Sequence, residues 1–450
     1  MTAHERSFHL GAFIWGVGHH GAAWRHPDTD LKGFTDFNFY KQIAEKAEAA
    51  KFDMIFFADR LAISDRYENR FDATLTFIPP VRLEPVSLLG ALGAVTEKIG
   101  LAATASTSYN EPFTLARKFA SLDHLTEGRI AWNIVTSTND GEALNHNREQ
   151  HFEHSERYAR AKEFLEVVTS LWDSWEDDAI VLDQETPLFA DPKKVHYLDH
   201  EGEWFQVRGP LNIPRPPQGH PIKIQAGSSP TGRDFAAASA DVIFTAQPTL
   251  EKAQDFYQDI QQRLIKAGRP QGSLKIMPGV MPIIGSTPQE AKEKADYLEQ
   301  LVDPIAGLAL LSDSMNHDLS QYPLDGPLPP LTEIRGNQSR FKLVQALAEK
   351  EQLTLRDLGK RFGGTRSHRL LIGTPEEIAV NLQTWFLSEA ADGFNIMPPY
   401  LPGGFTEFTD EVVPILQDLG LFRQDYHGST LRDHLGLAKP ANKFLQQKTV

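Results

Sequence analysis

Polar side chains stand within or directly after the last residues of several short apolar runs of this sequence. Their hydroxyl, amide, carboxylate and guanidinium groups can bind phosphate, orient a ring or transfer protons. The residues in these places are Asp59, Arg60, Thr104, Ser106, Thr107, Asn133, Thr136, Ser228 and Ser229. If the runs are strands of a parallel barrel, their carboxyl ends meet on one face, which makes these residues candidates for the site.

The segment Gly227-Ser228-Ser229 is the candidate phosphate site. It offers a flexible turn, backbone N–H groups and two hydroxyls at a predicted helix start, all of which suit an anion. An ordinary helix N-cap is the alternative, because serine is a preferred capping residue.

Histidines are the first candidates for proton transfer, because imidazole titrates near neutrality. His19 and His20 lie in a glycine-rich segment after the first apolar run, although they could also be loop histidines without a role. His154 and Tyr158 are four residues apart, so they share one face of a helix and could enter one pocket. A surface pair is the alternative.

Several kinds of chemistry are excluded by what the sequence lacks. There are no cysteines, so disulfides, thiolate metal sites, iron–sulfur clusters and a cysteine nucleophile are excluded. No GxGxxG motif follows a strand, and neither a P-loop nor a GxSxG motif is present. His151 and His154 belong to no HExxH pattern and lack a third ligand at a known spacing, so we expect no metal. If the protein is an oxidoreductase, we expect another polypeptide to consume NAD(P)H.

The composition of the 450 residues is that of an ordinary globular protein, with 41% hydrophobic and 23% charged residues. The 45 Lys and Arg residues against 60 Asp and Glu give a net charge of −15, which argues against nucleic-acid binding. It does not exclude a small anion held by local donors. The sequence shows no signal-peptide layout and no run near the roughly 20 apolar residues of a membrane span. We therefore expect a cytoplasmic protein that does not bind membranes.

Eight short apolar runs alternate with helical patterns, which is typical of repeated parallel βα units. The runs are residues 8–14, 53–58, 99–105, 130–136, 222–227, 241–246, 275–284 and 393–397. Since a closed barrel of this type has eight strands, the sequence predicts an α/β fold, a (β/α)₈ TIM barrel.

The helices between these runs carry clear signals. One apolar stripe at helical spacing consists of Tyr40, Ile43, Ala44 and Ala47. Pro112 suits a first helical position. Thr287 and Thr374 are predicted N-caps, each followed by a proline and by a glutamate, Glu290 or Glu377, that suits a capping box.

Two stretches do not fit the repeat and are predicted to be insertions in a single domain of residues 1–450. Residues 175–220 contain a predicted hairpin, formed by the segments VHYL and WFQV around 200–203, and a proline-rich connector. Residues 303–366 contain a loop followed by two helical pieces. The helices at 336–362 are a candidate lid or contact surface.

Five segments spread along nearly the whole chain carry a family resemblance. They are YNEPFTLARKFASLDHLTEGRIAWNIVTS (109–137), EHSERYARAKEFLEVV (153–168), VRGPLNIPRPPQGHPIKIQAGSSPTGR (207–233), GTPEEIAVNLQTWFLSEAADGFNIMPPYLPGG (373–404) and GSTLRDHLGLA (428–438). Together they resemble the nitrilotriacetate monooxygenase family, a branch of the bacterial-luciferase-like flavin monooxygenases. Its relatives include EDTA, dibenzothiophene-sulfone, long-chain-alkane and S-substituted N-acetylcysteine monooxygenases.

The resemblance implies a bacterial-luciferase-like TIM barrel that binds reduced FMN, delivered by a separate NAD(P)H:FMN reductase. It further implies that reduced FMN and O₂ give a C4a-hydroperoxyflavin, which oxidises a small organic substrate next to nitrogen or sulfur, with C–N or C–S cleavage. A homodimer or higher homo-oligomer is also implied, because such barrels commonly pair. The alternatives are a flavin- or deazaflavin-dependent reductase and a non-catalytic flavin-binding protein.

Matching positions give the expected roles of individual residues. The resemblance implies flavin or phosphate contacts from Asp59, Thr104, Ser106, Thr107, His154, Tyr158, Ser228 and Ser229, and the strand-end position adds Asn133. His19 or His20 is the first candidate to act on the peroxide. His317 is the second, since its position resembles a catalytic histidine of the alkane branch.

The sequence does not choose the substrate. Aminopolycarboxylates, S-substituted cysteine derivatives and aryl sulfones all remain open. A polycarboxylate would need arginine or lysine at the mouth of the pocket for charge-assisted pairing. Arg25, Arg60 and Arg82 could supply it, with structural roles for these arginines as the alternative.

Overall fold

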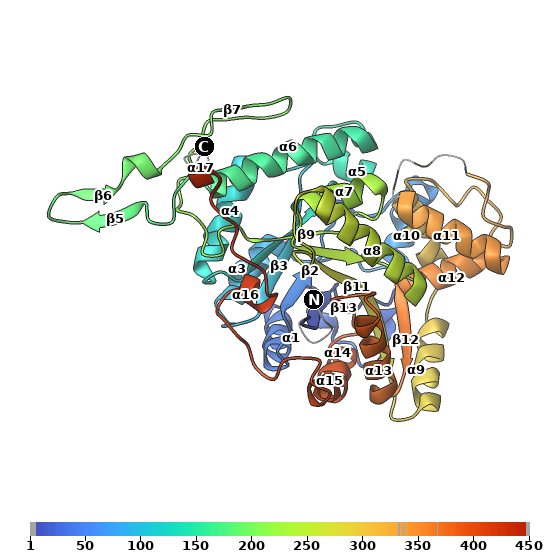
Figure 1. Ribbon diagram of the computed structural model, residues 1–450. Coiled ribbons are helices and arrows are strands. Elements are labelled where there is room, and N and C mark those ends of the chain that lie inside the picture. The colour runs from blue at the N-terminus through green and yellow to red at the C-terminus, as the bar shows by residue number, and fades with distance from the viewer. Residues whose placement is uncertain (1–5, 332–333, 335, 337, 367, 447–450) are drawn as a thin grey trace.

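Eight parallel strands form a closed barrel at the centre of the protein (Figure 1). The computed structural model describes residues 6–331, 334, 336, 338–366 and 368–446. The barrel strands are β1 (His9–Ile14), β2 (Met54–Phe57), β3 (Gly100–Ser106), β4 (Ile130–Val135), β9 (Ile222–Gln225), β10 (Val242–Thr245), β11 (Lys275–Ile284) and β13 (Gly393–Ile396). Their order is β10-β9-β4-β3-β2-β1-β13-β11, and pairing of β10 with β11 closes the barrel. The predicted (β/α)₈ fold and its eight strands are therefore confirmed.

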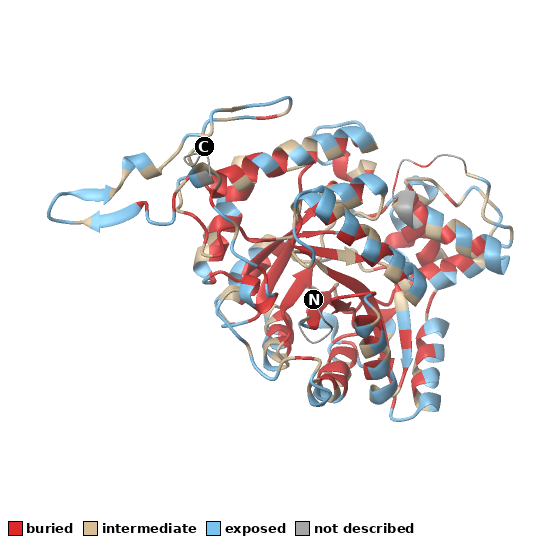
Figure 2. Cartoon of the chain, viewed as in Figure 1, coloured by how far each residue is buried: buried red, intermediate tan, exposed pale blue. Residues whose placement is uncertain are grey.

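Helices surround the barrel and bury its strands, as Figure 2 shows by the red centre and the pale outer helix faces. The longer ones are α1 (Phe37–Ala49), α3 (Pro85–Gly93), α4 (Pro112–Leu125), α6 (His154–Trp172), α7 (Pro230–Ser239), α8 (Leu250–Lys266), α9 (Pro288–Gln300) and α13 (Pro375–Leu387). The shorter ones are α2 (Asp72–Phe77), α5 (Asp140–Leu144), α14 (Gly403–Glu407), α15 (Val413–Asp418), α16 (Leu431–His434) and α17 (Lys443–Gln446). Apolar side chains such as Phe56, Ile224 and Met281 fill the barrel interior.

The helix signals of the sequence hold with one exception. The predicted stripe of α1 is buried, Pro112 opens α4, and Thr374 forms a reciprocal capping box with Glu377. Thr287 caps α9, but the capping box predicted there is wrong. The carboxylate of Glu290 accepts a hydrogen bond from the backbone N–H of Ser286 at 2.8 Å instead of reaching the cap residue itself.

A ninth strand, β12 (Arg369–Gly373), was not predicted. Strand β11 is 10 residues long; its first part pairs with β10 and its last part, Val280–Ile284, pairs with β12 outside the barrel. Along β12, Leu371 is buried while Leu370 and Ile372 are exposed. A short strand with one buried face gives a weak sequence signal, which is why the apolar-run criterion missed it.

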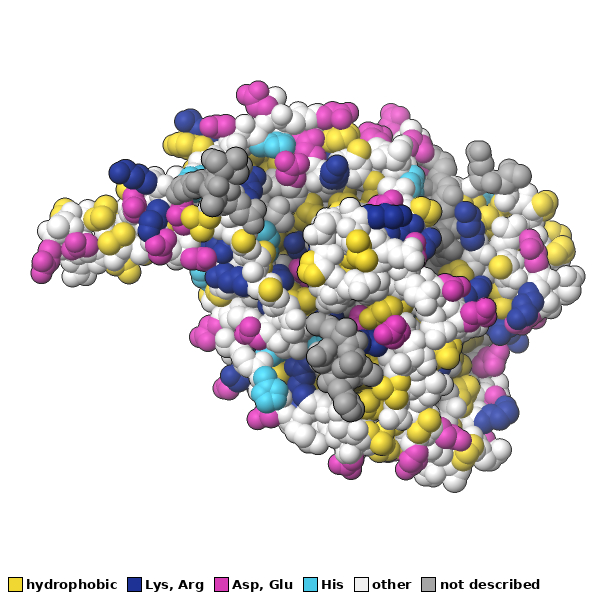
Figure 3. All heavy atoms as spheres, viewed as in Figure 1, with side chains coloured by type: hydrophobic (Ala, Val, Ile, Leu, Met, Phe, Trp, Pro, Cys, Tyr) yellow, Lys and Arg dark blue, Asp and Glu magenta, His cyan; other side chains and the backbone are white. Residues whose placement is uncertain are grey.

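The first insertion, between α6 and β9, carries two hairpins. Strands β5 (Ile180–Asp183) and β6 (Leu188–Ala190) form an arm that projects from the barrel (Figure 1) and exposes apolar side chains (Figure 3). Strands β7 (His200–Glu201) and β8 (Gln206–Val207) form the second hairpin.

The predicted hairpin exists, but its register was wrong. His200 pairs with Val207, so the segment VHYL lies before the first strand and the turn covers 202–205. The carboxylate of Glu163, on α6, accepts hydrogen bonds from the backbone N–H groups at 203, 204 and 205. This long-range contact holds the turn in place. It cannot be predicted from the residues of the hairpin alone.

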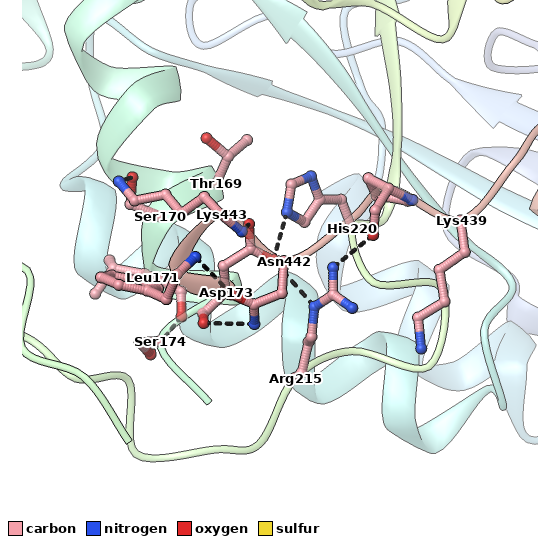
Figure 4. Close-up of polar contacts among 12 residues, drawn as sticks. Thr169, Ser170, Leu171, Asp173, Ser174, Arg215, His220, Lys439, Asn442 and Lys443 are labelled. Carbon is pink, nitrogen blue, oxygen red and sulfur yellow. Dashed lines mark hydrogen bonds and ion pairs between the residues drawn. The ribbon is translucent and has the colours of Figure 1, made fainter. Parts of the chain in front are cut away.

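Polar contacts around Asp173 fasten the base of this insertion to the C-terminal segment (Figure 4). The carboxylate of Asp173 accepts hydrogen bonds from Arg215 Nε at 3.0 Å and from the backbone N–H of Lys443 at 3.2 Å. Asn442 Nδ2 donates to the carbonyl of Asp173 at 2.8 Å. Although burial opposes it, the hydrogen bond and charge of His220 keep the pKa of Asp173 below its ordinary value.

The second insertion, between β11 and β12, is helical and packs as a separate apolar cluster. Helices α11 (Gln338–Glu351) and α12 (Leu355–Thr365) are the two predicted pieces, whereas the buried helix α10 (Pro304–Met315) was not predicted. Among the described helices, none is both long and apolar enough to cross a membrane.

Candidate active site

A cavity of about 720 Å³ lies at the carboxyl ends of the barrel strands. This is within the range of roughly 300–1,000 Å³ that is usual for ligand pockets. Residues that end or follow six strands line it, and they include Trp15, Asp59, Ser106, Ser137, Gly227 and Met397. Leu310 and Ser314 of α10 and Phe362 of α12 complete the wall, so the second insertion covers part of the cavity.

Most of the residues expected at the site line this cavity. They are His19, Asp59, Thr104, Ser106, Asn133, His154, Tyr158, Ser228 and Ser229. The rings of His154 and Tyr158 lie 4.9 Å apart on the first turns of α6, so they share one face as their spacing predicted. The strand-end rule and the helical spacing therefore selected residues that are far apart in the sequence but line one cavity in the fold.

Thr107, His20 and His317 do not line the cavity. Thr107 Oγ1 donates to the carbonyl of Val135 at 3.2 Å, and its side chain is buried. His20 is buried beside a small neighbouring pocket. His317, in the loop after α10, stacks on Tyr322 and makes a 3.0 Å hydrogen bond with its hydroxyl.

The turn Gly227-Ser228-Ser229 leads into α7 and forms a cradle. Ser229 is the N-cap, since its Oγ accepts a hydrogen bond from the N–H of Gly232 at 3.1 Å. A Cβ at position 227 would lie 2.9 Å from both Tyr158 Oη and Gly232 Cα, so only glycine fits there. The helix N-terminus adds backbone N–H groups and a partial positive charge.

A cation stands beside the cradle. Arg157 Nη1 donates to the carbonyl of Ser137 at 3.1 Å, while its buried Nε has no hydrogen-bond partner within the described part of the chain. Ser137 has a φ of 57°, which is unusual for a residue other than glycine and is typical of functional sites. This donor set of hydroxyls, backbone N–H groups and a guanidinium fits a phosphate.

Asn133 offers an unused acceptor at the end of β4. Its Nδ2 donates to Thr104 Oγ1 at 2.8 Å, and Thr104 Oγ1 donates to the carbonyl of Phe57 at 3.0 Å. The buried Oδ1 of Asn133 has no hydrogen-bond partner among the residues described. A buried acceptor left in this state suits a ligand that brings an N–H group, such as the imide of a flavin ring.

Asp59 lies at the end of β2 and is partly buried. Its Oδ1 accepts a hydrogen bond from the N–H of Arg60 at 2.7 Å in a loop, so it caps no helix. Burial raises the pKa of Asp59 above its ordinary value, and the backbone hydrogen bond opposes this shift.

His19 is fully buried at the end of the cavity nearest β1. Its Nε2 lies 2.9 Å from the carbonyl of Phe13, which can only accept, so Nε2 carries the proton and Nδ1 is the acceptor. Burial, helped by Arg366 and His368, lowers the pKa of His19 well below its ordinary value. His19 is therefore neutral at neutral pH.

Sequence reasoning missed several residues of the cavity. His368 stacks on Phe244 with ring centroids 5.3 Å apart, and it follows the second insertion rather than a barrel strand. Arg157 lies one residue before Tyr158 on α6. Gln225 ends β9, and the strand-end rule could have found it.

In the described parts of the chain, no group of three His, Asp or Glu residues is arranged to hold a metal ion.

Comparisons with known proteins agree with this geometry. The family model described as luciferase-like monooxygenase matches residues 13–390. The chain is 50% identical over 447 residues to N-acetyl-S-(2-succino)cysteine monooxygenase of Bacillus subtilis (strain 168), covering 99% of this chain and 100% of that protein. It is 48% identical over 444 residues to nitrilotriacetate monooxygenase component A of Aminobacter aminovorans, covering 97% and 98% of the two chains.

A solved structure shares the whole architecture. The crystal structure of a riboflavin lyase with modified FMN and riboflavin matches with a TM-score of 0.88 and 32% sequence identity. The match covers 97% of both chains.

Proposed function

Because this chain belongs to the luciferase-like monooxygenase family, we propose that it is the oxygenase component of a two-component system that uses reduced FMN and O₂. The observation that carries the proposal is the pairing of a phosphate cradle at α7 with an unused buried acceptor, Asn133 Oδ1, in the same cavity. Together they match the two ends of FMN, its phosphate and its ring.

Two groups of residues would bind the two ends of the cofactor. Ser228, Ser229, Tyr158 and Arg157 would hold the phosphate, and Asn133 with Thr104 and Asp59 would hold the ring. Ser106, whose Oγ lies 3.0 Å from Ser137 Oγ, and His154 complete this wall. Reduced FMN together with O₂ supplies the oxygen transfer when it is bound.

Protein groups around the reacting atoms have two tasks. His19 is neutral and keeps Nδ1 as an acceptor, so it would accept a hydrogen bond at that atom from a donor bound in the cavity. Helices α10 and α12 cover part of the cavity and would limit the access of water to the reacting atoms.

We propose that the substrate is a small organic molecule oxidised next to nitrogen or sulfur, with cleavage of the C–N or C–S bond. The names of two relatives support this, since nitrilotriacetate is an amine and N-acetyl-S-(2-succino)cysteine is a thioether. A separate NAD(P)H:FMN reductase is proposed as the partner that supplies the flavin. The lack of a GxGxxG motif and the words "component A" in one relative's name support it.

The test is an anaerobic titration of the protein with photoreduced and with oxidised FMN, followed by stopped-flow mixing with oxygenated buffer. Selective binding of reduced FMN, and a rate of flavin oxidation that differs from that of free reduced FMN, are expected. Equal binding of the two forms together with an unchanged oxidation rate would overturn the oxygenase proposal. It would favour a deazaflavin-dependent reductase or a flavin-binding protein.

A further inference from the structure

Arg82 lies between α2 and α3 and lines the cavity. The Cζ of its guanidinium is 4.0 Å from the ring centroid of Trp15. Its Nη1 is buried without a hydrogen-bond partner, and the described residues offer Arg82 no hydrogen bond or ion pair. Arginine carries five N–H donors, and leaving charged donors buried and unpaired is costly. A ligand acceptor is the natural partner for such a group.

Three carboxylates in the surroundings of Arg82 accept hydrogen bonds from other groups. Glu84 caps α3 and accepts hydrogen bonds from the backbone N–H groups of Val86 and Ser87. Glu142 accepts a hydrogen bond from the N–H of Leu61 at 3.1 Å, and Asp59 accepts the one from Arg60.

The neighbouring guanidinium of Arg60 differs from Arg82 because it is already neutralised. It donates to Ser64 Oγ and to the buried carboxylate of Asp313. Arg82 is therefore the arginine of this wall that the fold leaves available.

A second cation, at the end of the second insertion, lies over the same ring. Arg366, at the end of α12, has its Cζ 4.8 Å from the ring centroid of Trp15 and also lines the cavity. Both guanidiniums lie over the same indole, so an anion bound beside this ring is attracted by two positive charges. Burial, followed by the charge of Arg60, lowers the pKa of Arg82 to about 10, so it stays positive at neutral pH.

This cationic pair is not part of the phosphate cradle. The cradle follows β9, whereas Trp15 follows β1, and β9 and β1 are separated by β4, β3 and β2 in the barrel. On the other side they are separated by β10, β11 and β13, so the two strands lie opposite each other. One anion at each place leaves the strand ends between them for the flavin ring and the reacting carbon.

We propose that Arg82, together with Arg366, is a carboxylate subsite, and that the substrate of this enzyme carries at least one carboxylate that pairs with Arg82. This inference rests on the proposed function and names its substrate class. The planar guanidinium can hold both carboxylate oxygens at once. The apolar side chains of Phe13, Ile78 and Phe362 line the same cavity and receive the uncharged part of the substrate.

The test is calorimetric titration of the full chain with succinate, iminodiacetate and S-carboxymethylcysteine, in phosphate buffer with saturating FMN. Succinamide is the neutral analogue. The variants are R82Q, R82K, which keeps the charge but loses the planar fork, and R208Q as the control. Arg208 directly follows β8, and its side chain is 76% exposed.

We expect saturable binding of at least one carboxylate, weakened about tenfold or more in R82Q and less in R82K, with R208Q unchanged. Succinamide is expected to bind much more weakly. The subsite is overturned if none of the three acids binds, if R82Q binds them as the native chain does, or if succinamide binds equally well.

A separate FMN titration distinguishes this result from a failure of the proposed function. R82Q should bind FMN as the native chain does, because the cradle lies on the opposite side of the barrel, and that result also shows that the variant folds. If the native chain binds no FMN, the titrations are repeated without flavin, still in phosphate buffer. Arg82-dependent binding of a carboxylate would then support the subsite while the oxygenase proposal falls.

Discussion

The guanidinium of Arg60 donates a hydrogen bond to the buried carboxylate of Asp313, joining the loop after β2 to helix α10 of the second insertion. The other oxygen of Asp313 accepts from Asn139 Nδ2, in the loop after β4. One carboxylate therefore joins the second insertion to the loops after two barrel strands, both of which carry site residues. The position of this insertion depends on the buried contact as well as on apolar packing.

Replacing Asp313 with alanine should loosen the packing of α10 and the second insertion against the barrel. The change leaves the donors of Arg60 and Asn139 without their acceptor, and we expect a loss of about 1–3 kcal/mol in the free energy of unfolding. Urea denaturation measures this loss, and hydrogen exchange should quicken within α10. As a control, Asp325→Ala removes an exposed ion pair with Arg356 and should cost at most about 1 kcal/mol. Equal effects of the two variants would contradict the anchoring role of Asp313.

Gly227→Ala should damage the phosphate cradle. The new Cβ would meet Tyr158 Oη and Gly232 Cα at 2.9 Å, so the turn must shift away from its present position. We expect the affinity for FMN to fall about tenfold or more, measured by flavin fluorescence. The matched control is Gly90→Ala on α3, where the nearest atom in contact is Leu122 Cδ2 at 3.6 Å. Native affinity in Gly227→Ala would remove the cradle from the proposal.

Asn133→Ala should weaken FMN binding by a similar factor of about ten, because it removes the buried acceptor Oδ1. Thr107→Val is the informative partner variant. Its hydroxyl donates to the carbonyl of Val135, and Thr107 does not line the cavity, so we expect native FMN affinity. A strong loss in Thr107→Val would instead support the flavin contact that the family resemblance implies for this residue.

Acid should destabilise the protein through its buried histidines. Burial, with smaller effects of neighbouring charges, lowers the pKa values of His20, His151 and His434 from 6.5 to about 4. Between these values the unfolded chain binds protons that the folded chain does not, so stability present above pH 6.5 is lost as the pH falls toward 4. Each histidine contributes a slope of up to about 1.4 kcal/mol per pH unit.

Urea denaturation over this pH range measures that slope. His20→Gln should reduce it, because one uncharged buried histidine has been removed. An exposed histidine such as His427 serves as the control, and His427→Gln should leave the slope unchanged. A slope that stays the same in His20→Gln would show that this imidazole does not remain neutral in the folded state.

Much of the barrel and of its site was open to prediction from the sequence alone. The eight strands are local apolar runs, and Thr374 with Glu377 forms a cap within four residues, so neighbouring residues suffice to specify them. Barrel topology then brings strand ends together whatever the rest of the chain does. For that reason the positions of Asp59, Asn133 and Ser228 along the chain are enough to predict that they share one site.

The tertiary structure decided the features that depend on distant contacts. The carboxylate of Glu163 fixes the register of the second hairpin, and β12 exists only where β11 runs beyond the barrel. His368 and Arg366 reach the cavity because the second insertion folds back over the strand ends, which leaves His317 outside it. Local periodicity specifies which face of a segment is apolar. Which distant segments contact each other depends on tertiary packing, and this packing places Arg82 and Arg366 over the ring of Trp15.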